Sequence, residues 1–186
     1  MLFRSKPTLR KDGAPDRDPA KDATIPGALV SPTNGGTTNW PPPAYSPEAG
    51  LFYVIDREDY AMYYLTDPDP RGSMGLGGKT EVGVGSIGHY LAAIDYKTGN
   101  VVWRHKYPST AEGPGGGGTG LLTTAGRLLF ANDAGGNLVA FDVATGKPLW
   151  HSHIGSGTNA PETYALDGKQ YVLQAVGDMI YAFVLN

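Results

Sequence analysis

The chain has 186 residues, of which 40% are hydrophobic and 18% are charged, so it is long and apolar enough to bury a core. Its formal net charge is -3 and no basic cluster follows residues 1–21, which argues against a nucleic-acid-binding surface. The absence of cysteine excludes disulfides, thiolate metal sites, a cysteine nucleophile and covalently attached haem within this chain.

The first two segments of the chain are expected to lack regular strands. Residues 1–28 are polar and rich in charge and proline, which predicts an N-terminal arm or loop. Residues 29–49 contain five prolines, which exclude a helix and predict an ordered connection. The start of the chain lacks the apolar stretch of a secretory signal peptide, and no apolar run reaches membrane-spanning length.

From residue 51 onward, short apolar and β-branched runs alternate with glycine-containing turns. This pattern predicts an all-β fold without a long amphipathic helix. A Gly-rich loop is expected over residues 67–88, and Gly99 is expected to take the positive φ of a tight turn over residues 96–100. The expected strands are residues 51–56, 61–66, 90–95, 101–105, 128–131, 138–142, 148–153, 171–176 and 180–185.

Two stretches repeat each other at an offset of 47 residues: LAAIDYKTGNVVWRH at 91–105 and LVAFDVATGKPLWHS at 138–152. Each contains a strand, a turn closed by Thr-Gly and a strand with a tryptophan, and a weaker third copy, IYAFVL, begins at residue 180. A period in the forties with several short strands per unit is typical of propeller blades. The motif positions are Asp95, Gly99 and Trp103 in one copy and Asp142, Gly146 and Trp150 in the other.

A propeller blade cannot bury both of its faces alone and needs a neighbouring sheet on each side. Trp103 and Trp150 are therefore interpreted as structural contacts between blades rather than as catalytic residues. We expect about three four-stranded blades, near residues 45–110, 115–160 and 161–186, the last of them incomplete. The uncovered faces predict association with remaining propeller blades or with other copies of the chain.

The Asp-x-x-Thr-Gly-x-x-x-Trp pattern resembles the blade motif of dehydrogenases that depend on pyrroloquinoline quinone (PQQ), which are eight-bladed propellers. Three further segments resemble the alcohol dehydrogenases of that family, in the same order. They are GGTTNWPPPAYSPEAGLFYV at 35–54, GTGLLTTAGRLLFAND at 118–133 and TYALDGKQYVLQAVGD at 163–178. The resemblance covers residues 29–186 and implies the C-terminal blades of such a propeller.

The resemblance implies a periplasmic or secreted parent protein that oxidises a small alcohol by hydride transfer to PQQ, with calcium bound. Asn39 aligns with an asparagine near the PQQ ring, so Asn39 and, with less support, Trp40 are carried over as candidate PQQ contacts. The alternative is that Asn39 caps a turn and Trp40 packs against the prolines. The family's calcium ligands, catalytic Asp and vicinal disulfide lie upstream, so no catalytic residue and no metal ligand is assigned to this chain.

Two tryptophans that lie near the cofactor in relatives are replaced here, near Gly117 and at Gly177-Asp178. Two hypotheses therefore stay open: a portion of a PQQ-dependent alcohol dehydrogenase that is inactive alone, or a non-catalytic quinoprotein-like scaffold without a cofactor. An upstream vicinal cysteine pair and an Asp base would favour the enzyme. Because Met1 would fall in an internal loop of the parent, we expect a truncated gene product.

Three other patterns are given structural interpretations. Residues 83–88 match GxGxxG, but a strand rather than a helix is expected next, so no dinucleotide site is predicted. His151 and His153 alternate on one strand, but no third metal ligand has suitable spacing. An acidic stretch could bind calcium or act as acid and base, but is interpreted as solvated strand ends. Its members are Asp56, Glu58, Asp59, Asp67 and Asp69.

Overall fold

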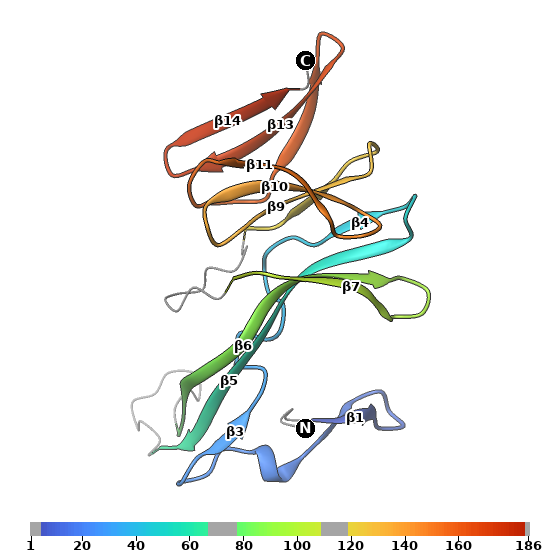
Figure 1. The fold of residues 1–186 in the computed structure, drawn as a ribbon. Coiled ribbons are helices and arrows are strands. Elements are labelled where there is room, and N and C mark those ends of the chain that lie inside the picture. The colour runs from blue at the N-terminus through green and yellow to red at the C-terminus, as the bar shows by residue number, and fades with distance from the viewer. Residues whose placement is uncertain (1–4, 67–77, 109–118, 185–186) are drawn as a thin grey trace. The chain divides into compact units, whose positions relative to one another are not determined.

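The computed structural model describes residues 5–66, 78–108 and 119–184 (Figure 1). Its described part consists of β-strands and one short 3-10 helix, which confirms the predicted all-β class. By its internal contacts the chain divides into two compact units. The first unit contains the described residues of Met1–Asn39 and Arg57–Ile87, and the second those of Trp40–Asp56 and Gly88–Asn186. None of the described helical segments is long and apolar enough to span a membrane.

In the first unit, β1 (Ser5–Leu9) pairs antiparallel with β2 (Pro15–Arg17). The 3-10 helix η1 (Pro19–Lys21) follows, and the Asp18 side chain caps it by accepting a hydrogen bond from Ala20 N. The strand β3 (Ala28–Val30) then pairs with the far end of β5. The segment that was expected to be an arm or loop therefore contains a strand pair, while a boundary at residue 28 stays a prediction.

Two long strands, β5 (Leu51–Leu65) and β6 (Lys79–Asp95), run through both units. The prediction of two separate strands over residues 51–66 is wrong, because β5 is continuous. The prediction of a loop is wrong for residues 79–88, which belong to β6, while residues 67–77 lie outside the described part. Pairing with β5 satisfies the backbone of this glycine-rich stretch, which local preference alone would leave irregular. The GxGxxG sequence is thus extended strand.

The second unit contains three consecutive antiparallel sheets. The first sheet is formed by β4 (Ala44–Ser46), residues 51–56 of β5, residues 88–95 of β6, and β7 (Val101–Lys106). The second sheet has the order β11 (Pro148–His153), β10 (Asn137–Asp142), β9 (Leu128–Asn132), β8 (Leu121–Thr123). The third sheet has the order β12 (Glu162–Leu166), β13 (Lys169–Val176), β14 (Met179–Val184). This arrangement confirms the predicted partial propeller.

The core of the second unit lies between successive sheets, with the second sheet between the other two (Figure 1). Leu91 and Tyr53 of the first sheet pack with Phe141 of the second in one buried cluster. Leu138 and Phe130 of the second sheet pack toward the third in another. Burial of one such side chain contributes about 1.5–3 kcal/mol, so these clusters hold the sheets face to face.

Candidate functional site

The turn between β6 and β7 is built around the carboxylate of Asp95. Asp95 Oδ1 accepts hydrogen bonds from Lys97 N at 2.9 Å, Thr98 N at 2.8 Å and Thr98 Oγ1 at 3.1 Å. Gly99 closes the turn with a φ of 72° and donates its N–H to Asp95 O. The backbone hydrogen bond from Thr98 is the main cause that lowers the pKa of Asp95.

The turn between β10 and β11 has the same construction. Asp142 Oδ1 accepts from Ala144 N at 3.1 Å, Thr145 N at 2.9 Å and Thr145 Oγ1 at 2.8 Å, and Gly146 has a φ of 69°. The hydroxyl of Thr145 is the main cause that lowers the pKa of Asp142. Both motif carboxylates are thus used by their own turns, which is a structural role.

Two side chains of the first sheet donate hydrogen bonds to the same backbone carbonyl beyond β10 of the second sheet. Trp103 Nε1 donates to Val143 O at 3.1 Å, and the Tyr53 hydroxyl donates to the same oxygen at 2.9 Å. The Trp103 ring lies so close to Gly146 that a Cβ atom added to Gly146 would be 2.6 Å from Cε3 of Trp103. Burial is the main cause that raises the pKa of Tyr53 to about 12. Indole, phenol and glycine are thus in close contact at this point.

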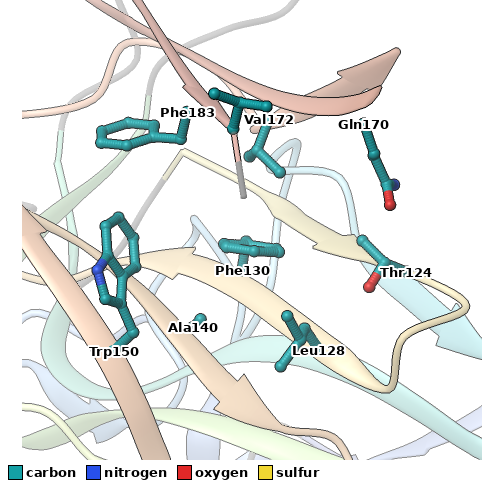
Figure 2. Close-up of a pocket in the computed structure, with 9 residues that line it drawn as sticks. Thr124, Leu128, Phe130, Ala140, Trp150, Gln170, Val172 and Phe183 are labelled. Carbon is teal, nitrogen blue, oxygen red and sulfur yellow. The ribbon is translucent and has the colours of Figure 1, made fainter. Parts of the chain in front are cut away.

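The contact between the second and third sheets contains a pocket of about 390 Å³ (Figure 2). Trp150 and Phe183 lie at one end with their rings edge to face, 5.2 Å apart, and Thr124 and Gln170 lie at the other. Trp150 is 42% exposed, and its indole N–H donates no hydrogen bond to the residues that the structure describes. The floor and walls are apolar, formed by Leu128, Phe130, Ala140 and Val172. A pocket with these walls suits an apolar group.

A smaller pocket of about 290 Å³ lies on the other side of the second sheet, between it and the first sheet. It is lined by His105, Tyr107, Asp133, Asn137 and His151, among others. Burial lowers the pKa of His105, with Asp133 acting against it, and burial is also the main cause that raises the pKa of Tyr107. The Tyr107 hydroxyl is buried and has no hydrogen-bond partner among the described residues. In the described ranges, no group of three or more His, Asp or Glu residues could hold a metal ion.

A buried polar bridge joins the second and third sheets, and sequence reasoning missed it. Asn132 Nδ2 donates to Gln174 Oε1 at 2.9 Å and to Thr119 Oγ1 at 2.8 Å, and Gln174 Nε2 donates to Asn159 O at 3.0 Å. Both amides are almost completely buried. The available signal was a glutamine in the middle of an apolar strand, where a buried amide needs partners.

The candidate PQQ contacts lie where the two units meet along the chain. Asn39 ends the first stretch of one unit and Trp40 begins the other. Asn39 Nδ2 donates to Gly35 O at 3.0 Å, and Trp40 is 71% exposed. Their role as PQQ contacts stays a prediction.

The remaining candidates are placed as follows. Asp56, Glu58 and Asp59 lie within continuous β5, so the interpretation of these residues as strand ends is wrong; Asp67 and Asp69 lie outside the described part. Asp56 forms an ion pair with Arg104 of β7. Gly177 has a φ of 59° in the two-residue turn that leads directly into β14, while Gly117 lies outside the described part.

Comparison with known proteins gives consistent results. The PQQ_2 family model, described as outer membrane protein assembly factor BamB, matches residues 36–184. The chain is 37% identical over 154 residues to a quinoprotein ethanol dehydrogenase of Pseudomonas aeruginosa, which covers 80% of this chain and 23% of that protein. It is 36% identical over 181 residues to a 1-butanol dehydrogenase (quinone) of Thauera butanivorans, covering 92% of this chain and 27% of the relative.

Solved structures show the same fold. A quinohemoprotein alcohol dehydrogenase of Pseudomonas putida HK5 superposes with a TM-score of 0.77 at 26% identity, over 95% of this chain and 28% of that one. The quinohemoprotein alcohol dehydrogenase of Comamonas testosteroni superposes with a TM-score of 0.77 at 24% identity, over 99% of this chain and 31% of that one. The chain spans about a quarter of the length of the curated relatives it matches.

Proposed function

The chain belongs to the PQQ_2 family and is homologous to quinoprotein alcohol dehydrogenases, and from this premise we propose that it forms the C-terminal sheets of a PQQ-dependent alcohol dehydrogenase-like propeller. The observation that carries the proposal is the succession of three sheets joined by the Trp103, Val143 and Gly146 contact. This repeat architecture is shared with relatives four times as long. In the complete protein, further sheets would supply the remaining walls.

The described residues do not by themselves fit a complete quinone and metal site. Asn39 and Trp40 are exposed, and the described part contains no group of three metal ligands. Bound PQQ would accept the hydride of a small alcohol, with calcium as its metal. Under the proposal, this chain contributes Asn39, Trp40 and structural walls, and the catalytic base comes from outside it. We therefore propose that the chain alone is inactive, that its partners are further propeller sheets, and that the parent is periplasmic.

A titration of the purified chain with PQQ and calcium tests this proposal. Quinone absorbance measures binding, and alcohol-dependent reduction of a dye measures turnover. We expect weak PQQ binding without turnover, and weaker binding still in Asn39→Ala than in the matched control Asn34→Ala, another exposed asparagine of the first unit. Turnover by the chain alone would contradict the proposed dependence on further sheets.

A non-catalytic scaffold is the second candidate, and one observation favours it. The Gly177-Asp178 turn carries no aromatic side chain at the place where relatives have a tryptophan near the cofactor, and β14 begins at Met179. If wild type, Asn39→Ala and Asn34→Ala all fail to change the quinone absorbance, the scaffold function is supported and the PQQ proposal fails.

A further inference from the structure

The loop that follows β3 makes a tight turn at Asn34 and Gly35. Gly36 N donates to Thr33 O at 3.0 Å, which places Asn34 and Gly35 at the two central positions of a β-turn. Asn34 is exposed, and its side-chain amide makes no hydrogen bond to a residue that the structure describes. Within the described part, the Gly35 N–H also donates no hydrogen bond. The side-chain amide and the next backbone nitrogen are therefore free to react with each other.

The glycine after Asn34 removes the usual obstacle to such a reaction. A side chain on the following residue shields the backbone nitrogen and restricts the backbone rotation that brings it to the amide. Gly35 has no side chain, and a Cβ atom added to it would meet only Thr33 Oγ1, at 3.7 Å, among the described residues. Of the asparagines in the chain, Asn34 alone is followed by glycine.

The other asparagines are held in place or are followed by a residue with a side chain. Asn132 is almost completely buried, and its Nδ2 donates to Gln174 Oε1. Asn137 Nδ2 donates to Asp133 Oδ2 at 2.8 Å, and Asn39 Nδ2 donates to a backbone carbonyl. The residues that follow the other asparagines within the chain are Trp40, Val101, Asp133, Leu138 and Ala160.

We propose that Asn34-Gly35 is a site of spontaneous deamidation, which loosens the loop that carries Asn39. The Gly35 backbone nitrogen gives its proton to a solvent base and attacks the side-chain carbonyl carbon of Asn34. A carbon–nitrogen bond forms, and the side-chain nitrogen takes up a proton and leaves as ammonia. Water then opens the succinimide ring at either of its carbonyl carbons and leaves aspartate or isoaspartate at position 34. Water is consumed and ammonia is released, and nothing is oxidised or reduced.

The product changes two contacts of this loop. Asn34 N donates to both carboxylate oxygens of Glu81, at 3.0 and 3.2 Å, so the new carboxylate lies close to an existing one and like charges repel. Asn39 Nδ2 donates to Gly35 O at 3.0 Å, and isoaspartate lengthens the backbone just before Gly35 by a methylene group. Both changes weaken the contacts that hold the loop. The reaction requires neither PQQ binding nor alcohol oxidation.

Peptide mass spectrometry of the purified chain, incubated at mildly alkaline pH, tests the proposal. The tryptic peptide of residues 22–57 contains both Asn34 and Asn39, and its fragment spectra distinguish them. We expect the mass change from amide to carboxyl to accumulate at Asn34, and to do so faster as the pH rises. Asn39 should stay intact over the same time. Enzymatic methylation of isoaspartate identifies the second product.

Two glycine variants provide the matched comparison. Gly35→Ala should slow the loss of Asn34, whereas Gly126→Ala should leave it at the wild-type rate. Neither glycine has a positive φ, and at both a Cβ atom would meet a threonine Oγ1 at 3.7 Å, so both variants should fold. Circular dichroism verifies this. An intact Asn34 in wild type, an earlier reaction at another asparagine, or a wild-type rate in folded Gly35→Ala would overturn the proposal.

Amide hydrogen exchange tests the loosening separately. Residues 31–39 should exchange faster in Asn34→Asp, which carries the charge of the product, than in the neutral control Asn34→Gln. Equal exchange in the two variants would overturn the proposed effect on the loop. A chain that fails to bind PQQ would give the same deamidation and exchange results, so the failure of the proposed function is distinguishable from the failure of this inference.

Discussion

The two contacts between neighbouring sheets use equivalent residues and each contains a pocket, but they differ in how well the motif tryptophan is covered. At the first contact, Trp103 and Tyr53 both donate to Val143 O, and Gly146 lies against the indole. At the second, Trp150 and Phe130 take the equivalent places, and a pocket lies beside them (Figure 2). Trp103, which meets a glycine turn and a carbonyl of the next sheet, is therefore better covered than Trp150.

The largest expected difference is between the two tryptophans themselves. Trp103→Ala should lower the free energy of unfolding by about 3–5 kcal/mol, because it leaves a cavity and an unmade hydrogen bond. Trp150→Ala should cost only about 1–2 kcal/mol, since that ring is partly exposed and makes no hydrogen bond to a described residue. Urea denaturation followed by circular dichroism measures both. Equal losses would show that the two contacts are equally closed.

The glycines of the two turns give the next largest difference. Gly146→Ala should lower the free energy of unfolding by about 1–2 kcal/mol because alanine is strained at a positive φ. The clash of its Cβ with Trp103 should lower it by about 1–3 kcal/mol more. Gly99→Ala is the matched control, because Gly99 has nearly the same φ but open space around its Cα. Urea denaturation followed by circular dichroism measures the loss of stability in both variants. If the control loses as much stability as Gly146→Ala, the close approach of Trp103 has no energetic effect.

A single hydroxyl separates Tyr53 from its equivalent Phe130. Tyr53→Phe should lower the free energy of unfolding by about 1 kcal/mol, because the buried bond to Val143 O is lost. Tyr164→Phe removes a hydroxyl from an exposed ring and should change stability by less than about 0.5 kcal/mol. Thermal unfolding of the two variants side by side makes the comparison. A neutral Tyr53→Phe would mean that Trp103 alone closes the first contact.

The smallest expected effect concerns pH and the two turn carboxylates. The pKa values of Asp95 and Asp142 are lowered in the folded chain, so their contribution to stability is present above the ordinary carboxyl pKa of 3.8. It is lost as the pH falls below 3.8, when the folded-state carboxylates take up protons. Between neutral and acid pH, the midpoint of urea denaturation should fall less in Asp142→Asn than in wild type. Asp167→Asn is the control, and an equal change in both variants would contradict the role of the Asp142 turn.

Much of the second unit could be predicted from local patterns. The strands β9, β10, β11 and β13 lie close to their predicted ranges, because alternating apolar residues and Thr-Gly turns act within a few residues. The long ribbon of β5 and β6 could not be predicted, because its glycine-rich half is strand only through pairing with a distant segment. The bridge from Asn132 to Gln174 was missed for the same reason: its partners are 42 residues apart in sequence.

The sequence by itself determined the all-β class, the repeat, and the family, since these depend on short motifs and their spacing. It also determined the two motif turns, because an Asp, a Thr and a Gly close each turn with their own backbone. Only the tertiary structure decided that Trp103 packs against Gly146 while Trp150 borders a pocket, although both occupy the same motif position. The reason is physical: whether a side chain is covered depends on what the neighbouring sheet presents to it, and that contact lies outside the motif itself.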